Sequence, residues 1–251
     1  MTTTPLLQVQ DVCKSFGGVQ ALHHVNFDLT PGELLGVIGP NGSGKTTLVN
    51  TITRFVKPTS GRVIFKGRKI SDLPPHKIVR LGIARTFQMV KPFYHLPAYK
   101  NMIIPLFSPR MKQLAGGRYG DRNAVALDLL EEVGFERDSL VAYKPAGALP
   151  QGYLKRLELA KAIALQPELF ILDELFSGLS LAEVASIVPI IEKIRLKGKT
   201  IIMIEHRLKE LFRIADRVIV MNYGQKIADG RAEAVMADEM VKSAYLGTET
   251  D

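Results

Sequence analysis

The stretch that decides the fold of this chain is Gly39-Pro40-Asn41-Gly42-Ser43-Gly44-Lys45-Thr46-Thr47. An apolar run, Leu34–Ile38, precedes it and is typical of a buried strand. After it, Leu48, Ile52 and Phe55 are spaced as one face of a helix. A strand, a glycine-rich loop ending in Lys-Thr and a helix together form the context that a phosphate-binding loop requires.

Each residue type in this loop has a chemical reason. Glycines let successive backbone N–H groups turn toward phosphate oxygens, and the N-terminus of the following helix adds its positive dipole. We expect the Lys45 ammonium to lie against the β- and γ-phosphates and the Thr46 hydroxyl to bind Mg²⁺. The alternative is a glycine turn without a ligand. The loop is predicted to bind a nucleoside triphosphate through Gly39, Pro40, Asn41, Gly42, Ser43, Gly44, Lys45, Thr46 and Thr47.

Length and composition set the broad class. A chain of 251 residues with 46% apolar residues has ample core for one large domain or two small ones, which excludes a disordered protein. No uninterrupted apolar stretch reaches the roughly 18 residues of a membrane-spanning helix, and the N-terminal residues lack a signal-peptide pattern. Cys13 is the single cysteine, so no internal disulfide forms and a reducing cytoplasm is expected.

The charge balance is basic, with 33 Lys and Arg against 25 Asp and Glu and a net charge of +8. Nucleic-acid binding, proximity to anionic lipid or ATP, and plain solubility are the competing interpretations. The positive residues are scattered and do not form a stripe with aromatic residues. We therefore expect a solvated surface and no nucleic-acid partner, with examples at Arg62, Lys66, Arg68, Lys69, Lys155, Arg156 and Lys161.

The pattern along the chain predicts an α/β protein. Strands are expected in the antiparallel region 6–29 and at residues 62–65, 169–172 and 200–204, with a hairpin at 217–228. Between the segments 169–172 and 200–204 lies an apolar stripe at helical spacing, at Val184, Ile187, Ile191 and Ile194. Residues 89–166 are helix-like, with a loop at 108–109 and 116–120. The predicted fold is a P-loop NTPase core of residues 1–88 and 167–251, with a mixed sheet, flanking helices and an antiparallel β subdomain, plus a helical insertion subdomain at 89–166.

Two carboxylates end the apolar strand at 169–172. Asp173 is predicted to hold Mg²⁺, directly or through water, and Glu174 to accept a hydrogen bond from the water that attacks the γ-phosphate. An acidic helix cap after a core strand is the alternative. The phosphate loop upstream favours the catalytic interpretation, because ligands of parallel sheets bind at the carboxyl ends of the strands.

Three further residues are candidates by position. His206 ends the strand at 200–204 and is predicted to bond the γ-phosphate and link it to Glu174, although a surface or structural histidine is the alternative. Gln88, where the core gives way to the insertion, is predicted to ligate Mg²⁺ and report it to that insertion. Phe16, in Lys14-Ser15-Phe16-Gly17-Gly18, is predicted to stack on a base or else to be a core side chain.

In this order the residues resemble the ATP-binding subunits of ABC transporters, over essentially the whole chain. Within that family the chain looks most like the subunits of branched-chain amino acid importers. The segments that carry this resemblance are Ile83-Ala84-Arg85-Thr86-Phe87-Gln88, Leu149-Pro150-Gln151-Gly152, Leu157-Glu158-Leu159-Ala160, Ile204-Glu205-His206 and Ala244-Tyr245-Leu246-Gly247.

The resemblance implies a function, cofactors and partners. It implies hydrolysis of ATP with Mg²⁺ at the cytoplasmic face of the cell membrane, and energy supplied to the import of amino acids. It implies a second ATP-binding subunit (a copy or a paralogue), transmembrane permease subunits and an external substrate-binding protein. Gln151 and Gly152 would bind the ATP that the opposite subunit holds. The permease would dock around residues 90–101, including Phe93, Tyr94 and Leu96.

The chain departs from the family pattern in its signature segment. Pro150 stands where the family has serine, which removes a hydroxyl and a backbone N–H, and Tyr153 and Leu154 stand where polar residues are usual. Leu175 replaces a proline, and Ser180 replaces an aspartate. If the chain pairs with a different subunit, its own phosphate loop is expected to be the faster site. The alternatives are a non-transport ABC ATPase and a regulatory subunit that binds ATP without hydrolysis.

Overall fold

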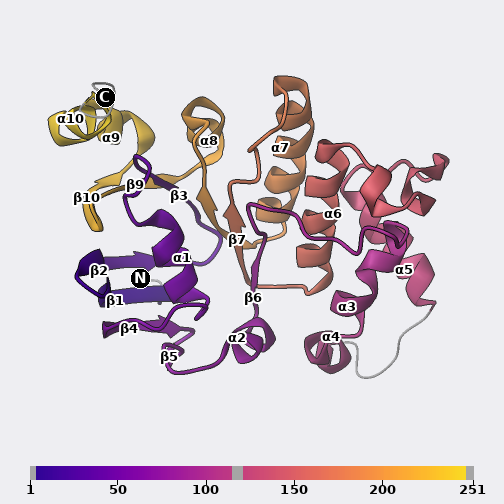
Figure 1. The fold of residues 1–251 in the computed structure, drawn as a ribbon, viewed down its shortest axis with the longest axis horizontal. Helices are drawn as coiled ribbons and strands as arrows, with labels where there is room; N and C mark the ends of the chain where they lie inside the picture. Colours follow the sequence, from indigo (N-terminus) through magenta and orange to yellow (C-terminus); the bar gives the residue numbers. More distant parts are fainter. Residues whose placement is uncertain (1–3, 115–120, 247–251) are drawn as a thin grey trace.

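The structure, a computed structural model, describes residues 4–114 and 121–246. The predicted loop at 116–120 and Gly247 of the C-terminal motif lie outside these residues. Figure 1 shows an antiparallel sheet at one end of the long axis and a group of short helices at the other, with a second sheet between them. No helix in the described ranges has both the length and the apolar character needed to cross a membrane.

The antiparallel sheet has the strand order β2-β1-β4-β5. It confirms the strands expected at 6–29 and 62–65. Val25 and Phe27 are buried and alternate with exposed Asn26 and Asp28, because successive side chains of a strand point to opposite faces. Its strands are β1 (Leu7–Phe16), β2 (Val19–Leu29), β4 (Ser60–Phe65) and β5 (Arg68–Lys69).

The second sheet has the order β10-β9-β3-β8-β7-β6, and it is parallel except for the pairing of β9 with β10. Because β3, β8 and β7 are parallel neighbours, their carboxyl ends lie at one edge of the sheet. That edge carries all three predicted strand-end motifs. The strands are β3 (Leu34–Ile38), β6 (Ile83–Arg85), β7 (Leu169–Asp173), β8 (Thr200–Ile204), β9 (Arg217–Asn222) and β10 (Gln225–Gly230).

Each face of the central strands packs into a different core. On β3, Leu34 and Ile38 belong to the core shared with the helical region, whereas Leu35 and Val37 belong to the core shared with the antiparallel sheet. A strand buried on both faces is continuously apolar, which is the pattern of Leu34–Ile38. The phosphate loop therefore begins from a strand that is fixed on both sides.

Helices cover the sheet and form the region after β6. The helix α7 buries Val184, Ile187, Ile191 and Ile194, which confirms the predicted stripe. The α-helices are α1 (Lys45–Ile52), α2 (Pro75–Leu81), α3 (Ile103–Leu106), α4 (Pro109–Leu114), α5 (Arg122–Glu132), α6 (Gln151–Ala164), α7 (Leu181–Leu196), α8 (Leu208–Ile214), α9 (Ala232–Ala237) and α10 (Glu239–Leu246). Short 3-10 turns are η1 (Tyr99–Met102), η2 (Leu140–Tyr143) and η3 (Ala146–Ala148).

Two local expectations are wrong. Phe55 does not extend the buried face of α1, because that helix ends at Ile52 and the Phe55 side chain is exposed, edge-on to Phe87. Ser108-Pro109 is not a loop as a whole, since Pro109 begins α4. Proline suits the first turn of a helix, where its missing N–H has no intrahelical acceptor. The strand β6 was not predicted, because its three residues are too few to show a period.

Candidate active site

The phosphate loop connects β3 to α1 and depends on glycines with positive φ. Gly39 has φ of 148° and Gly44, the residue before α1, has φ of 101°. A Cβ added at Gly39 would lie 2.1 Å from the Met221 carbonyl oxygen, so no other residue fits there. Gly42, at φ of 77°, has no atom within 4 Å of its Cβ position. The loop is therefore packed at its base and open at its tip, as a cradle for phosphate requires.

Lys45 is buried under this loop. Its Nζ donates to the carbonyl oxygens of Gly39 at 2.7 Å and Pro40 at 2.9 Å. Burial lowers the pKa of Lys45, and the nearby Glu174 and Asp173 carboxylates act in the opposite direction. The ammonium thus lies between the loop and the two carboxylates that end β7, where a phosphate group would find a positive charge.

Glu174 is the point at which three predicted residues meet. Its Oε2 accepts a hydrogen bond from Gln88 Nε2 at 2.5 Å, and its Oε1 lies 3.1 Å from His206 Nε2. Residue 174 also has φ of 49°, in the left-handed region that few non-glycine residues adopt. The strand order explains the meeting, because β8 pairs directly with β7 and Gln88 follows β6 on the other side.

Asp173 has a partner that the sequence did not reveal. Arg85 Nη2 donates to Asp173 Oδ2 at 2.6 Å, and its Nη1 donates to Asn50 Oδ1 of α1 at 2.7 Å. The Asp173 backbone N–H donates to Thr86 Oγ1 at 3.3 Å. Arg85 was visible only as part of the Arg-Thr-Phe-Gln segment. Its place at the end of β6, next to β7, is what brings it to Asp173.

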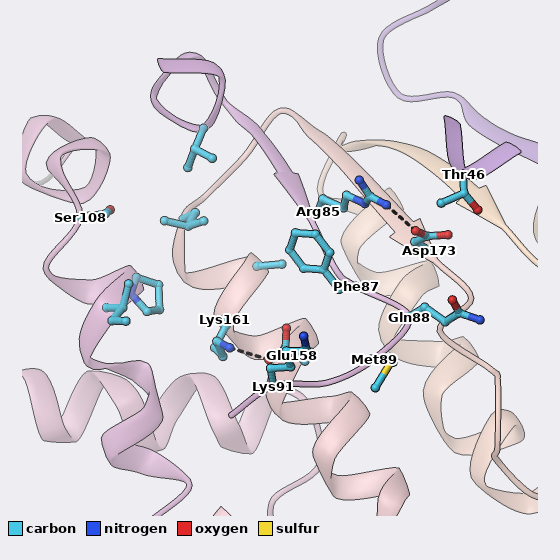
Figure 2. Close-up of a pocket in the computed structure, with 15 residues that line it drawn as sticks. Thr46, Arg85, Phe87, Gln88, Met89, Lys91, Ser108, Glu158, Lys161 and Asp173 are labelled. Carbon is cyan, nitrogen blue, oxygen red and sulfur yellow. Dashed lines mark hydrogen bonds and ion pairs between the residues drawn. The ribbon is translucent and has the colours of Figure 1, made fainter. Parts of the chain in front are cut away.

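A cavity of about 700 Å³ joins the predicted Mg²⁺ ligands to the helical region. Thr46, Gln88 and Asp173 line it together, and Figure 2 shows Thr46 beside Asp173 with Phe87 projecting into the cavity. A hydroxyl, an amide and a carboxylate are the hard oxygen donors that Mg²⁺ prefers. The residues present therefore fit this ion.

The ring of Phe16 lies outside both cores, with 48% of the residue exposed and Lys14 Nζ 4.6 Å from the ring centroid. The alternative of a core phenylalanine is wrong. An exposed ring at the end of β1 is available to stack on a base.

The signature-like segment begins α6 and is separate from the phosphate loop of the same chain. Gln151 is exposed and Gly152 is buried, and no hydrogen bond among the described residues joins either of them to the phosphate loop. A Cβ at Gly152 would lie 2.6 Å from Glu183 Oε1, so the approach of that carboxylate requires glycine. That Gln151 and Gly152 bind the nucleotide of a second subunit stays a prediction.

The unusual residues near this segment have structural roles. Tyr153 packs its ring against Phe135, with centroids 5.0 Å apart, and therefore belongs to the core of the helical region. Ser180 caps α7, where its hydroxyl accepts from the Glu183 backbone N–H and the Glu183 carboxylate accepts from the Ser180 backbone N–H. Such a capping box stabilises a helix N-terminus. Pro150 precedes α6 and offers no capping side chain.

Lys155 was expected on the solvated surface, and this expectation is wrong. It is 1% exposed, and its Nζ donates to the carbonyl oxygens of Gln88 at 2.9 Å and Glu174 at 3.0 Å. A signal was present: on a helix, residue 155 shares a face with Leu159 and Ala162, which are both buried.

Glu205, next to His206, is buried as well. Its Oε1 accepts from the Phe176 backbone N–H at 2.8 Å, and burial raises its pKa to about 7. No local pattern separates Glu205 from other carboxylates, because it is adjacent to an exposed histidine at a strand end.

Known proteins with the same organisation are numerous. The sequence pattern described as ABC transporter matches residues 22–177. The high-affinity branched-chain amino acid transport ATP-binding protein LivG of Escherichia coli (strain K12) is 36% identical over 256 residues, covering 97% of this chain and 98% of that protein. The corresponding protein BraF of Pseudomonas aeruginosa is 35% identical, with coverage of 97% and 98%.

Solved structures agree with the sequence comparison. A nucleotide-free ATP-binding cassette from an ABC transporter superposes with a TM-score of 0.86 at 30% identity, covering 96% of this chain and 99% of that chain. An ATP-binding cassette in its ADP conformation gives the same TM-score at 31% identity, with coverage of 98% and 100%. A dimeric cassette bound to ADP and Pi, in a post-hydrolysis state, gives 0.78 at 26% identity, with coverage of 90% and 98%. The chain belongs to the ABC transporter family, as one of its ATP-binding and ATP-hydrolysing subunits.

Proposed function

We propose that this chain is a Mg²⁺-dependent ATPase at the cytoplasmic face of a membrane, where it drives an amino-acid permease. The observation that carries the hydrolytic part is the position of Glu174, held between Gln88 Nε2 and His206 Nε2 at the edge of the sheet where the phosphate loop begins. A subunit that only binds ATP would not need this arrangement. The amino-acid specificity is supported by the relatives in Escherichia coli and Pseudomonas aeruginosa, which are ATP-binding proteins of branched-chain amino acid transport.

In the proposed reaction the loop from Gly39 to Thr47 holds the phosphates with its N–H groups, and Phe16 stacks on the base. Lys45 exchanges its bonds to Gly39 and Pro40 for bonds to the β- and γ-phosphates. Thr46, Asp173 and Gln88 would hold Mg²⁺, which neutralises the charge that develops on the phosphate oxygens.

Glu174 supplies the base of the reaction. Its carboxylate accepts a proton from the attacking water and orients it in line with the γ-phosphate. His206 Nε2 lies 3.1 Å from Glu174 Oε1. When ATP binds, this N–H would turn its hydrogen bond toward the γ-phosphate, with the Glu174 carboxylate beside it. Both proposed roles are supported by the contact between the two residues and by the strands that carry them.

The active form is proposed to be a dimer with a copy or a paralogue. Gln151, exposed, and Gly152, buried behind it, begin α6 and would meet the nucleotide held by the second subunit. The dimeric cassette bound to ADP and Pi supports a dimeric form. Pro150 offers that nucleotide neither a hydroxyl nor an N–H, so the site completed by this segment is proposed to be the slower one.

The cavity next to Gln88 is proposed as the place where a permease segment docks. Its wall is largely apolar side chains, among them Phe87, Met89 and Ile104, with Lys91 and Lys161 beside them. Phe93, Tyr94 and Leu96 are exposed nearby in sequence and extend the same proposed surface.

The helical region 89–166 would then act as one subdomain that moves with the permease, and residues 1–88 and 167–251 as the other. An external substrate-binding protein would deliver the amino acid to the permease.

The first experiment is steady-state hydrolysis of Mg²⁺-ATP by the purified chain, with Glu174→Gln as the control. We expect turnover in the wild type and a loss of about a hundredfold to ten-thousandfold in the variant, with ATP still bound. ATP binding without turnover in the wild type would require a test with a paralogous subunit. If turnover is absent there too, the proposed hydrolysis is wrong.

A further inference from the structure

Lys155 is a buried cation whose ammonium donates hydrogen bonds to the backbone of two residues of the proposed catalytic site. It lies on α6 one turn after Gln151, and it is 1% exposed. Its Nζ donates to the carbonyl oxygens of Gln88 at 2.9 Å and Glu174 at 3.0 Å. A buried ammonium is costly unless it is paired and hydrogen-bonded, so its position is held by these acceptors.

Burial and nearby carboxylates act on the pKa of Lys155 in opposite directions. Burial has the largest effect and lowers this pKa. The carboxylates of Glu205, Glu174, Asp173 and Glu158, in decreasing order of effect, raise it. Glu205 is itself buried and accepts from the Phe176 backbone N–H at 2.8 Å. The ammonium and this carboxylate therefore hold the chain on both sides of residue 175.

Glu174 needs such support because its backbone is strained. Its φ of 49° is rare for a residue with a Cβ, and such conformations persist only where surrounding contacts fix them. On one side its N–H donates to the Ile204 carbonyl oxygen at 2.9 Å. On the other side its carbonyl oxygen accepts from Lys155 Nζ. Loss of the second contact would let the peptide relax and carry the carboxylate away from Gln88 and His206.

We propose that Lys155 is a positioning residue for Glu174, through which the signature-like end of α6 is connected to the catalytic carboxylate of the same chain. One ammonium holds the carbonyls of Gln88 and Glu174, whose side chains are bonded to each other. A shift of α6 when a second subunit docks on Gln151 would therefore move both residues together. This inference rests on the proposed hydrolysis by Glu174.

The test compares Lys155→Met, Lys155→Arg and Lys155→Gln in the full chain. Methionine keeps the apolar length and removes the donors, arginine keeps the charge and donors, and glutamine keeps amide donors without charge. Lys197→Met is the matched control, because Lys197 forms an ion pair with Glu132 far from the site, with about half of its side chain exposed. The measurements are kcat and KM for ATP hydrolysis, direct ATP binding and thermal unfolding.

We expect K155M to lower kcat about tenfold to a hundredfold, the usual effect of losing hydrogen bonds from a charged donor, with KM and ATP affinity unchanged. K155R is expected to restore most of kcat, and K197M to leave it unchanged. A K155M protein with wild-type kcat would contradict the inference, as would a loss explained entirely by unfolded protein. If K155M does not fold, the other two variants decide. A kcat that falls from wild type to K155R and again to K155Q, at constant KM, supports the inference. An equal kcat in these three proteins overturns it.

Failure of this inference is separable from failure of the proposed function. Absence of ATP hydrolysis in the wild type, alone and with a partner subunit, contradicts the proposed function. An active wild type with an equally active K155M contradicts only the role of Lys155.

Discussion

The Arg85 guanidinium lies 2.6 Å from the Asp173 carboxylate, and the two side chains are only 6% and 5% exposed. This ion pair joins the end of β6 to the end of β7, and Arg85 extends it to α1 through Asn50. The proposed Mg²⁺ ligand is therefore already neutralised before any cation binds. An Mg²⁺ ion at Asp173 must share this carboxylate with the arginine.

Removing Arg85 should be costly for stability. Arg85→Met leaves a buried carboxylate without its partner, and breaking one side of a buried ion pair typically costs about 3–5 kcal/mol. We expect R85M to lower the free energy of unfolding by that amount in urea denaturation without nucleotide. The double variant R85M/D173N should cost less than the sum of the single variants, since the unpaired charge is gone.

A surface arginine is the control for this comparison of single and double variants. Arg137 pairs with Asp128 and Glu131, but its side chain is 56% exposed, and R137M should change stability by less than about 1 kcal/mol. Strict additivity of R85M and D173N would show that the buried pair has no net coupling.

Glu205 should make stability depend on pH. Its pKa is raised from 4.5 to about 7 in the folded chain, chiefly by burial. Between these values the unfolded chain loses the proton while the folded chain keeps it, so the free energy of unfolding falls as pH rises. Glu205→Gln removes this effect and keeps the acceptor for the Phe176 N–H. Relative to wild type, E205Q should gain stability from about pH 5 to pH 8, by up to about 3 kcal/mol.

Urea unfolding of wild type and E205Q from about pH 5 to pH 8 measures the difference in their free energies of unfolding. Other titrating groups contribute almost equally to both proteins, so they largely cancel in this difference. Lys155, Glu174 and His206 surround Glu205 and are present in both proteins. Parallel stability curves for E205Q and wild type would contradict a raised pKa at this carboxyl.

Pro150→Ser should raise turnover without a large change in stability. Serine restores a hydroxyl and an N–H that can reach the nucleotide of the second subunit, and each bond to a charged phosphate is worth about tenfold or more in rate. The new cap of α6 would add about 1 kcal/mol of stability. The lost proline would remove about 0.4–1 kcal/mol, so the two effects nearly cancel. Steady-state hydrolysis and urea unfolding of P150S test both parts, and an unchanged rate in a protein that binds ATP normally contradicts the role of Pro150.

A heterodimer would reveal whether its two ATP sites hydrolyse at different rates, as proposed. This chain's phosphate loop would meet the partner's signature segment, so Glu174→Gln here should abolish most of the turnover. The equivalent change in the partner should matter less. Equal losses from the two changes would rule out a slow site at Pro150.

The cavity next to Gln88 should couple hydrolysis to transport. Lys91 is exposed at its edge, and Lys91→Glu should reduce amino-acid uptake by the assembled transporter while the purified chain keeps its ATPase rate. Lys209→Glu, an equal charge reversal at an exposed position of α8, is the control. Uptake by reconstituted vesicles measures the effect, and unaffected uptake in K91E would place the docking surface elsewhere.

Most of the fold could be predicted from the sequence because its strands have clear hydrophobic patterns. The continuous apolar runs at β3, β7 and β8 and the alternation in β2 are each visible without a structure. The positions of Glu174 and His206 followed from the carboxyl-end rule, and the structure places them in contact. Their chemical roles, and those of Gln88 and Phe16, stay predictions.

The residues that were missed are placed mainly by contacts between elements that lie far apart in the sequence. Arg85 meets Asp173 only because β6 and β7 are adjacent, although the two residues are 88 positions apart in the sequence. Lys155 lies inside because α6 turns that face toward Gln88 and Glu174, and a lone lysine on a helix is usually solvated. The end of α1 was misplaced for a related reason, since Phe55 packs on Phe87 from a loop and not from a helix.

The partners of Lys155 are carbonyl oxygens, which every amino acid possesses. Exchanging the side chain at position 88 or 174 therefore leaves the lysine's acceptors intact. A chain inactivated at Glu174 should keep the backbone path of the working enzyme, and an ATP-trapped dimer made with E174Q can serve as a faithful template of the native closed state.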